Sequence, residues 1–285
     1  MLKAILSCSA LLAVTSTVAL ADSFTFTTGS PDGKIATLSR SASAGKLETE
    51  TADDFVTTAS TTFITSATFT GLLVGGATPA NIKNVEVELY HVFPLDSTLP
   101  PDGRVLTRGN SPSDNNFAAA DGALGQLSFS TKVLNPTFTA ANSVANGINA
   151  LPGQFTGGEG AVTGEEVEFD VTFNTPFVLG PDHVFFRPEV DLGSSGDFFW
   201  LSAAPGTAFA PNLQSWIRND GAGALGPDWE RIGTDVTGQG PFQASFTLAG
   251  ETVPEPSSVL LLLSGTPPLA FWLRRKAYRG SSASR

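Results

Sequence analysis

Two stretches of this chain alternate between apolar and charged or polar residues, and that alternation restricts the fold more than any other feature. Residues 85–90 read VEVELY, and residues 166–173 read EVEFDVTF. Successive side chains of a β-strand point to opposite faces of a sheet, so a period of two gives each strand one apolar face. We therefore expect Val85, Val87 and Leu89 to be buried, together with the four apolar residues of the second stretch.

The remainder of the central chain has the same character, with no helical period and no internal repeat. Runs rich in Thr, Phe and Val, which favour strands, occur at residues 24–26, 61–73, 127–134, 176–179, 183–188, 198–201 and 242–248. The run FFWL at 198–201 predicts a strand covered on both faces, and Gly71 is a candidate bulge. Residues 213–218 and 229–232 predict a closing strand pair.

Amphipathic strands of this number need two packed layers to bury their apolar faces. The prediction is an all-β chain that forms an antiparallel two-sheet β-sandwich, jelly-roll-like, as one domain over residues 22–250. Two long segments rich in Gly, Asn and Pro are expected to be loops, residues 94–123 and residues 135–160, the second with one or two short strands. We expect Trp200, Trp216 and Trp229 to fill the core, although exposed tryptophans would offer stacking surfaces for sugar rings.

The first 21 residues predict a secretory signal peptide. Lys3 precedes an apolar run that ends in Ala19-Leu20-Ala21, a small-x-small site for cleavage before Asp22. The single cysteine, Cys8, lies inside this leader, so the mature chain would hold neither a disulfide nor a thiolate metal site.

The last segment, residues 251–285, has three parts. They are the turn Val253-Pro254-Glu255-Pro256, the apolar run 257–273 and a basic tail, 274–285, that begins with Arg274, Arg275 and Lys276. This order resembles the PEP-CTERM sorting signal of Gram-negative bacteria, a Pro-Glu-Pro motif followed by one membrane helix and a basic cluster. The resemblance implies processing by an exosortase, export through the inner membrane, and delivery to the cell surface or an extracellular polysaccharide matrix.

One feature of this tail departs from the family's pattern. A helix that spans a membrane needs about 20 apolar residues, whereas the apolar run has 17 and contains Gly265-Thr266-Pro267-Pro268. Prolines remove backbone donors and kink a helix, so weak insertion is expected. The basic tail and exported domain follow the positive-inside rule. We therefore predict a transient sorting label that contacts the membrane.

The charge is strongly acidic and excludes one class of partner. The net charge is −11, and residues 22–250 hold 25 Asp and Glu against 10 Lys and Arg. Such a surface repels phosphate backbones, so no nucleic-acid partner is expected. No cofactor is predicted, except that carboxylates could bind calcium. Asp53 and Asp54, expected beside a loop, are the first candidates, and Asp114, Asp191 and Asp197 are weaker ones.

No catalytic residue is predicted. His91 and His183 stand alone, and no nucleophile elbow, phosphate-binding loop or dinucleotide motif is present. Three sets of paired carboxylates are candidates: Asp53/Asp54, Glu86/Glu88 and Glu165/Glu166/Glu168. The pairs Glu86/Glu88 and Glu166/Glu168 have i, i+2 members about 7 Å apart on a strand, within the range used by glycoside hydrolases. The leading hypothesis is a non-enzymatic surface or matrix protein, structural or polysaccharide-associated; the alternative is a secreted carbohydrate-active enzyme that uses such a pair.

Overall fold

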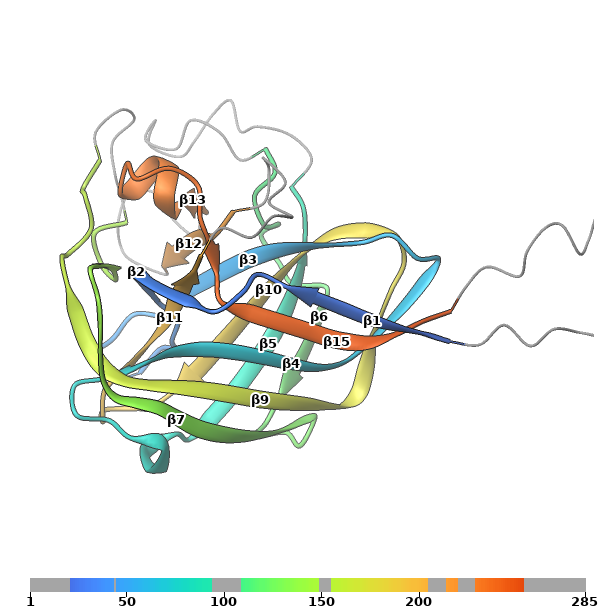
Figure 1. Ribbon diagram of the computed structural model, residues 1–285, viewed down its shortest axis with the longest axis horizontal. Coiled ribbons are helices and arrows are strands. Elements are labelled where there is room, and N and C mark those ends of the chain that lie inside the picture. The colour runs from blue at the N-terminus through green and yellow to red at the C-terminus, as the bar shows by residue number, and fades with distance from the viewer. Residues whose placement is uncertain are drawn as a thin grey trace, which may run out of the picture.

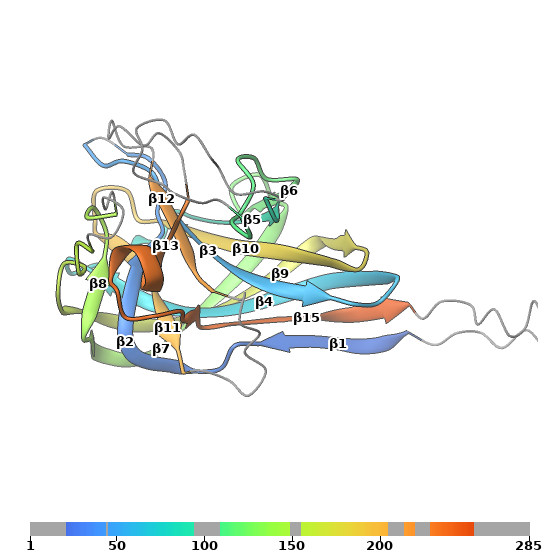
Figure 2. The same ribbon diagram turned by 90° about the horizontal axis from the view of Figure 1, so that it is seen from above.

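The computed structural model describes residues 21–43, 45–93, 109–148, 155–204, 214–219 and 229–253. Within these residues, fifteen strands form two sheets packed face to face (Figures 1 and 2). The strands are β1 (Asp22–Thr27), β2 (Pro31–Leu38), β3 (Thr49–Thr57), β4 (Thr61–Val74), β5 (Asn84–His91), β6 (Ala118–Asp121), β7 (Leu127–Ala140), β8 (Asn142–Val144), β9 (Val162–Leu179), β10 (Asp182–Asp191), β11 (Asp197–Ala203), β12 (Trp216–Asn219), β13 (Glu230–Arg231), β14 (Gln243–Ala244) and β15 (Phe246–Val253). The predicted all-β sandwich is therefore confirmed.

The two sheets differ in size. The smaller sheet has six strands in the order β13-β12-β3-β10-β5-β6. The larger sheet has nine, with β1-β15-β4-β11-β2-β8 as its main path, β14 beside β11, and β9 and β7 continuing from β4. Every pair is antiparallel except β2 with β8, which pair in parallel and depart from the antiparallel prediction.

Strand β4 is the place where the larger sheet forks. One edge of β4 pairs with β9 along nearly its whole length. The other edge pairs first with β15, over Thr61–Phe69, and then with β11, over Gly71–Val74. The predicted bulge at Gly71 is wrong, since the register with β9 is continuous there and shifts between Ile64 and Ser66. A Cβ on Gly71 would collide with the Phe198 ring, so glycine allows the close approach of β11.

The core lies between the sheets and follows the predicted alternation. Val85, Val87 and Leu89 are buried, as are the four apolar residues at alternate positions of β9 between 167 and 173. Phe rings from the two sheets pack against each other. Phe186 of the smaller sheet stacks on Phe246 of the larger sheet, with 5.2 Å between ring centroids. Burial of each such ring contributes about 1.5–3 kcal/mol, so a core of this size stabilises the domain without disulfides.

The first and last described strands, β1 and β15, pair with each other. Asp22 lies opposite Thr252, so both ends of the described sandwich lie at the same end of the molecule (Figures 1 and 2). Strand β15 continues past Gly250 to Val253, which pairs with Thr61. The first residue of the Val-Pro-Glu-Pro turn is therefore the last residue of the sheet.

Helical structure is limited to single turns in the part of the chain that is described, a 3-10 turn η1 (Pro79–Asn81) and a π-helical turn η2 (Ile232–Val236). None of the described residues forms a helix with the length and apolar character needed to cross a membrane. The predicted membrane-type helix at 257–273 and the signal peptide up to residue 20 lie outside the described residues.

Candidate functional site

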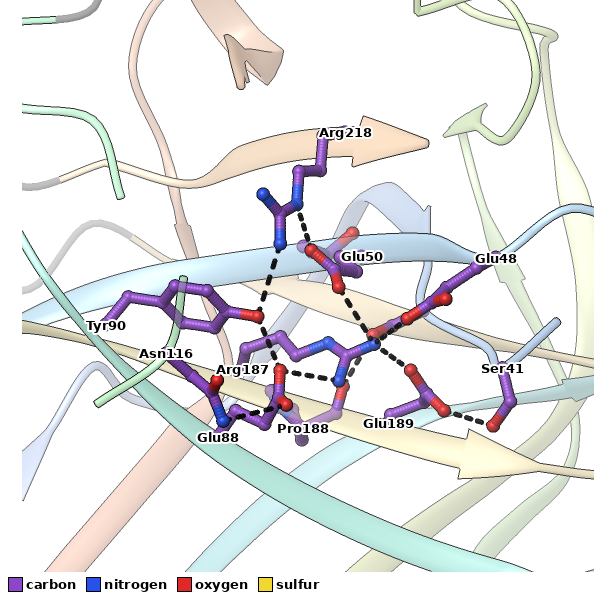
Figure 3. A network of polar contacts seen from close by, with 12 residues as sticks. Ser41, Glu48, Glu50, Glu88, Tyr90, Asn116, Arg187, Pro188, Glu189 and Arg218 are labelled. Carbon is purple, nitrogen blue, oxygen red and sulfur yellow. Dashed lines mark hydrogen bonds and ion pairs between the residues drawn. The ribbon is translucent and has the colours of Figure 1, made fainter. Parts of the chain in front are cut away.

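The outer face of the smaller sheet carries a buried network of charged residues (Figure 3). Its centre is Arg187 of β10, which is 1% exposed. The guanidinium lies 2.9 Å from Glu88, 3.2 Å from Glu48 and 3.4 Å from Glu50, and it also contacts Glu189. Strand register explains one of these contacts, because Arg187 pairs with Glu88 across the β10–β5 ladder. We call this network, with Arg218 and the rings described next, the arginine face.

Arg218 of β12 is the second cation of the arginine face. It contacts Glu50, and its guanidinium lies over the Trp229 ring, 4.5 Å from the centroid. It also donates a hydrogen bond to the Asp114 carbonyl oxygen at 2.9 Å. Trp229 Nε1 donates to the neighbouring Ser113 carbonyl oxygen at 3.2 Å. These bonds fasten the segment before β6 over the outer face of the sheet.

Electrostatics show that the charges on the arginine face compensate one another. Burial alone would raise the pKa of Glu50, but the charges of Arg187 and Arg218 outweigh it and lower that pKa. Burial would lower the pKa of Arg187, yet the surrounding carboxylates raise it. Burial raises the pKa of Glu48 and of Glu86, although Arg187 opposes this. A buried charge is tolerated only with such partners, so this network has the character of a structural lock.

Asp53 and Asp54, the first calcium candidates, occupy the middle of β3 and are fully buried, so their predicted position beside a loop is wrong. Asp53 accepts hydrogen bonds from the Ser215 hydroxyl, at 2.9 Å, and from the Ala244 N–H. Asp54 accepts from the Gln214 N–H at 2.8 Å. Burial raises the pKa of both carboxyls, and their proximity adds to the shift at Asp53. Among the described residues, no three acidic, His or Cys side chains are grouped to hold a metal ion.

The remaining histidine and aspartate candidates have local partners. His183 Nε2 lies 2.5 Å from Asp54, and His91 Nδ1 lies 3.1 Å from Asp182. Arg40 and Lys46 bind Asp197 at 2.7 and 2.9 Å. Asp191 accepts a hydrogen bond from the Gly193 N–H at 2.6 Å, and Asp114 contributes its backbone carbonyl to the arginine face. The structure therefore does not gather these aspartates into one site.

The two predicted carboxylate pairs have different surroundings. Glu88 is engaged by Arg187 and by the Tyr90 hydroxyl, which donates to it at 2.5 Å. Glu166 and Glu168 instead line a groove of about 340 Å³ on the outer face of the larger sheet. We call it the acidic groove; its lining residues are Thr27, Gly29, Ser30, Pro31, Thr68, Thr70, Leu134, Glu166, Glu168, Ser245, Phe246 and Thr247. Glu165 lines a separate hollow with Gly164.

Glu166 is the most unusual group of the acidic groove. It is 8% exposed, and no hydrogen bond or ion pair engages its carboxylate among the described residues. Burial raises its pKa, and the charge of Glu168 raises it further. The Glu166 oxygens are not among the fully buried side-chain atoms without a partner, so they open onto the groove, where a ligand that donates hydrogen bonds can reach them.

Tryptophan positions confirm the expectation of burial. Trp200, Trp216 and Trp229 are at most 1% exposed, so none of them offers an open stacking surface. Trp216 begins β12 and Trp229 immediately precedes β13, and these two strands are the pair predicted from the sequence. Sequence reasoning missed Arg187 and Arg218; the available signal was a cation directly after an apolar run, VFF before Arg187 and WI before Arg218.

The sorting and cleavage residues lie mostly beyond the described region. Val253 ends β15, Asp22 begins β1, and Ala21 immediately precedes it. The residues outside the described ranges are Ala19, Pro254, Glu255, Pro256, Arg274, Arg275 and Lys276.

Comparisons with known proteins add little. No protein-family model matches the chain, and no curated protein matches it. Among solved structures, it is similar to the cysteine protease and lectin-like domains of Cwp84, a surface layer associated protein of Clostridium difficile. The TM-score is 0.36 and the identity 11%, over 72% of this chain and 33% of that chain. Similarity at this level supports no conclusion about function.

Proposed function

We propose that this chain is an exported, non-enzymatic protein of the Gram-negative cell surface or extracellular matrix, sorted by its C-terminal signal and associated with polysaccharide. One observation carries the proposal: β1 and β15 pair, so that Asp22 and Val253 leave the sandwich at the same end. A leader before Asp22 and a sorting tail after Val253 would both be directed to the membrane from that end. The opposite end and the outer face of the larger sheet would then be free to meet other molecules.

The proposal names an exosortase as processing partner and the membrane as a transient contact through residues 257–273. The order of Pro-Glu-Pro turn, apolar run and basic cluster supports it. A non-enzymatic role is supported by the chemistry of the described side chains. The carboxylates of the arginine face are held by two guanidiniums, and each histidine is paired with an aspartate.

Cell fractionation tests the sorting signal. The full chain would be compared, in a host that makes an exosortase, with a chain that ends at Val253, since an earlier stop would remove part of β15. A matched variant with Pro254, Glu255 and Pro256 changed to Ala keeps the apolar run. We expect the full chain in the envelope or released after processing, and the variant retained unprocessed in the membrane. The proposal would be refuted if all three chains had the same cellular distribution and the full chain and the Ala variant had the same, unprocessed mass.

A second candidate, a carbohydrate-active enzyme, is favoured by one observation. Glu166 and Glu168 lie two residues apart in a groove, and the pKa of Glu166 is raised, as suits a general acid. Release of reducing sugar from a polysaccharide by the full chain, lost in both Glu166→Gln and Glu168→Gln, would establish this activity in place of the non-enzymatic role.

A further inference from the structure

We infer that the acidic groove binds a neutral, hydroxyl-rich sugar chain. This inference rests on the polysaccharide association proposed above and specifies its site and ligand class. The acidic groove lies where β4 changes partner from β15 to β11 and the β1–β2 connection passes nearby. Its volume of about 340 Å³ is near the lower end of small-molecule sites, which span about 300–1,000 Å³.

The carboxylate of Glu166 is the main argument for a ligand. The residue is nine-tenths buried, lines the groove and has no hydrogen-bond donor among the described residues. Carboxylates on the arginine face, by contrast, are engaged by guanidinium groups. A carboxylate has only acceptor oxygens, so its missing partner must supply donors. Adjacent sugar hydroxyls are such donors, and Glu168 beside it offers two further acceptor oxygens.

The other lining groups fit the two kinds of surface that a sugar ring presents. Hydroxyl side chains, which both donate and accept, line the groove at Thr27, Ser30, Thr68, Thr70, Ser245 and Thr247. Apolar contact is available from Pro31 and from Leu134, which is 40% exposed. A pyranose has hydroxyls around its rim and C–H groups on its faces, so it can use both surfaces together.

Charge selects among possible ligands. An anionic polysaccharide would meet the unpaired carboxylates of Glu166 and Glu168, and like charges that face each other at an interface oppose binding. A metal ion is the other chemical possibility, but no group of three suitable side chains for it occurs among the described residues. A neutral sugar chain needs no counter-charge and satisfies the acceptors directly.

Binding of defined polysaccharides to the full chain tests this inference. The apolar run calls for detergent, and a polyoxyethylene detergent avoids the sugar headgroups that would compete. Affinity gel electrophoresis with soluble neutral glucans, dextran and laminarin, is expected to retard the protein, whereas polygalacturonate is not. Glu166→Gln should weaken binding about tenfold, because one charged acceptor is lost. Leu134→Ala, at a half-exposed position that leaves folding intact, should weaken it several-fold.

Glu251→Gln is the matched control. It removes the same charge from the larger sheet at an exposed position of β15, outside the groove. It should bind as tightly as the parent chain. Equal binding by all three variants, binding only of polygalacturonate, or calcium binding that Glu166→Gln abolishes while glucan binding is absent, would each overturn the inference. Failure here with correct cell sorting refutes this site alone; missorting with intact glucan binding refutes the sorting proposal alone.

Discussion

The two outer faces of the sandwich use acidic residues in opposite ways. On the smaller sheet, Arg187 and Arg218 lie among Glu48, Glu50, Glu88 and Glu189 and hold them in ion pairs. On the larger sheet, Glu166 lines a groove with no donor among the described residues. Both environments are largely buried, so the difference is one of pairing and not of exposure.

That difference separates a structural role from a binding role. Burial of a charge is costly, and a counter-charge with good hydrogen bonds offsets most of the cost within the folded chain. The arginine face makes this compensation internally and fastens a segment over the sheet. In the acidic groove no group of the described chain compensates Glu166, so the compensating donors must come from a bound molecule. We therefore assign the ligand to the larger sheet.

Removal of the central cation should give the largest effect. Arg187→Met leaves several buried carboxylates without their shared partner, so we expect a loss of about 3–5 kcal/mol in the free energy of unfolding. Urea titration followed by tryptophan fluorescence measures it, because Trp200, Trp216 and Trp229 are all buried. The midpoint should fall with little change in the slope.

The control for Arg187→Met is removal of a cation from the larger sheet. Lys132 lies on β7, opposite Glu168 in the β7–β9 register, with no ion pair among the described residues. Lys132→Met should change stability by no more than about 0.5 kcal/mol. If the two variants lost similar stability, the arginine face would not be the structural lock described above.

The alternation of the sequence was sufficient to predict the inner faces of the sheets but not their outer faces. A period of two identifies Val85, Val87 and Leu89 as core residues because the signal is local. The contact of Arg187 with Glu88 joins positions 99 residues apart, and that of Arg218 with Glu50 joins positions 168 apart. Such contacts depend on strand order and register, which composition does not specify.

The same limit explains the candidate sites. Glu166 and Glu168 could be recognised as a pair from their spacing, yet the groove around them depends on the fork in β4. Asp53 and Asp54 had a loop-like acidic composition, but long-range donors from Gln214, Ser215 and Ala244 hold them inside β3. Burial of a polar side chain in the middle of a strand can therefore be predicted only when its hydrogen-bond partners, here distant in sequence, are known.

Acid should weaken the arginine face through Glu50. Its folded pKa is lowered from the ordinary 4.5, so the folded state favours the charged form. This contribution is fully present above pH 4.5 and is lost as the pH falls through the lowered value. Each unit of pKa difference corresponds to about 1.4 kcal/mol. The contribution of Glu50 to stability, measured from pH 7 to pH 3, should fall below pH 4.5.

Glu50→Gln is the variant that isolates this contribution. It should be less stable than the parent chain at pH 7, and the difference should shrink as the pH falls, because protonation makes the two side chains alike. Glu48 and Glu86, whose folded pKa values are raised, act in the opposite direction and gain stability as the pH falls toward 4.5. A difference between parent and Glu50→Gln that is constant with pH would show that the guanidiniums do not hold Glu50 charged.

The smallest expected effect lies in the acidic groove and has the opposite sign. Burial and Glu168 raise the folded pKa of Glu166, so its charged form opposes folding at neutral pH. Glu166→Gln should therefore stabilise the chain slightly at pH 7, with the gain disappearing as the pH falls to 4.5. At the same concentration, a neutral glucan should raise the melting temperature of the parent chain more than that of the variant. A loss of stability at pH 7 would mean that the Glu166 carboxylate serves the fold, as the carboxylates of the arginine face do, and that the two outer faces do not differ in kind.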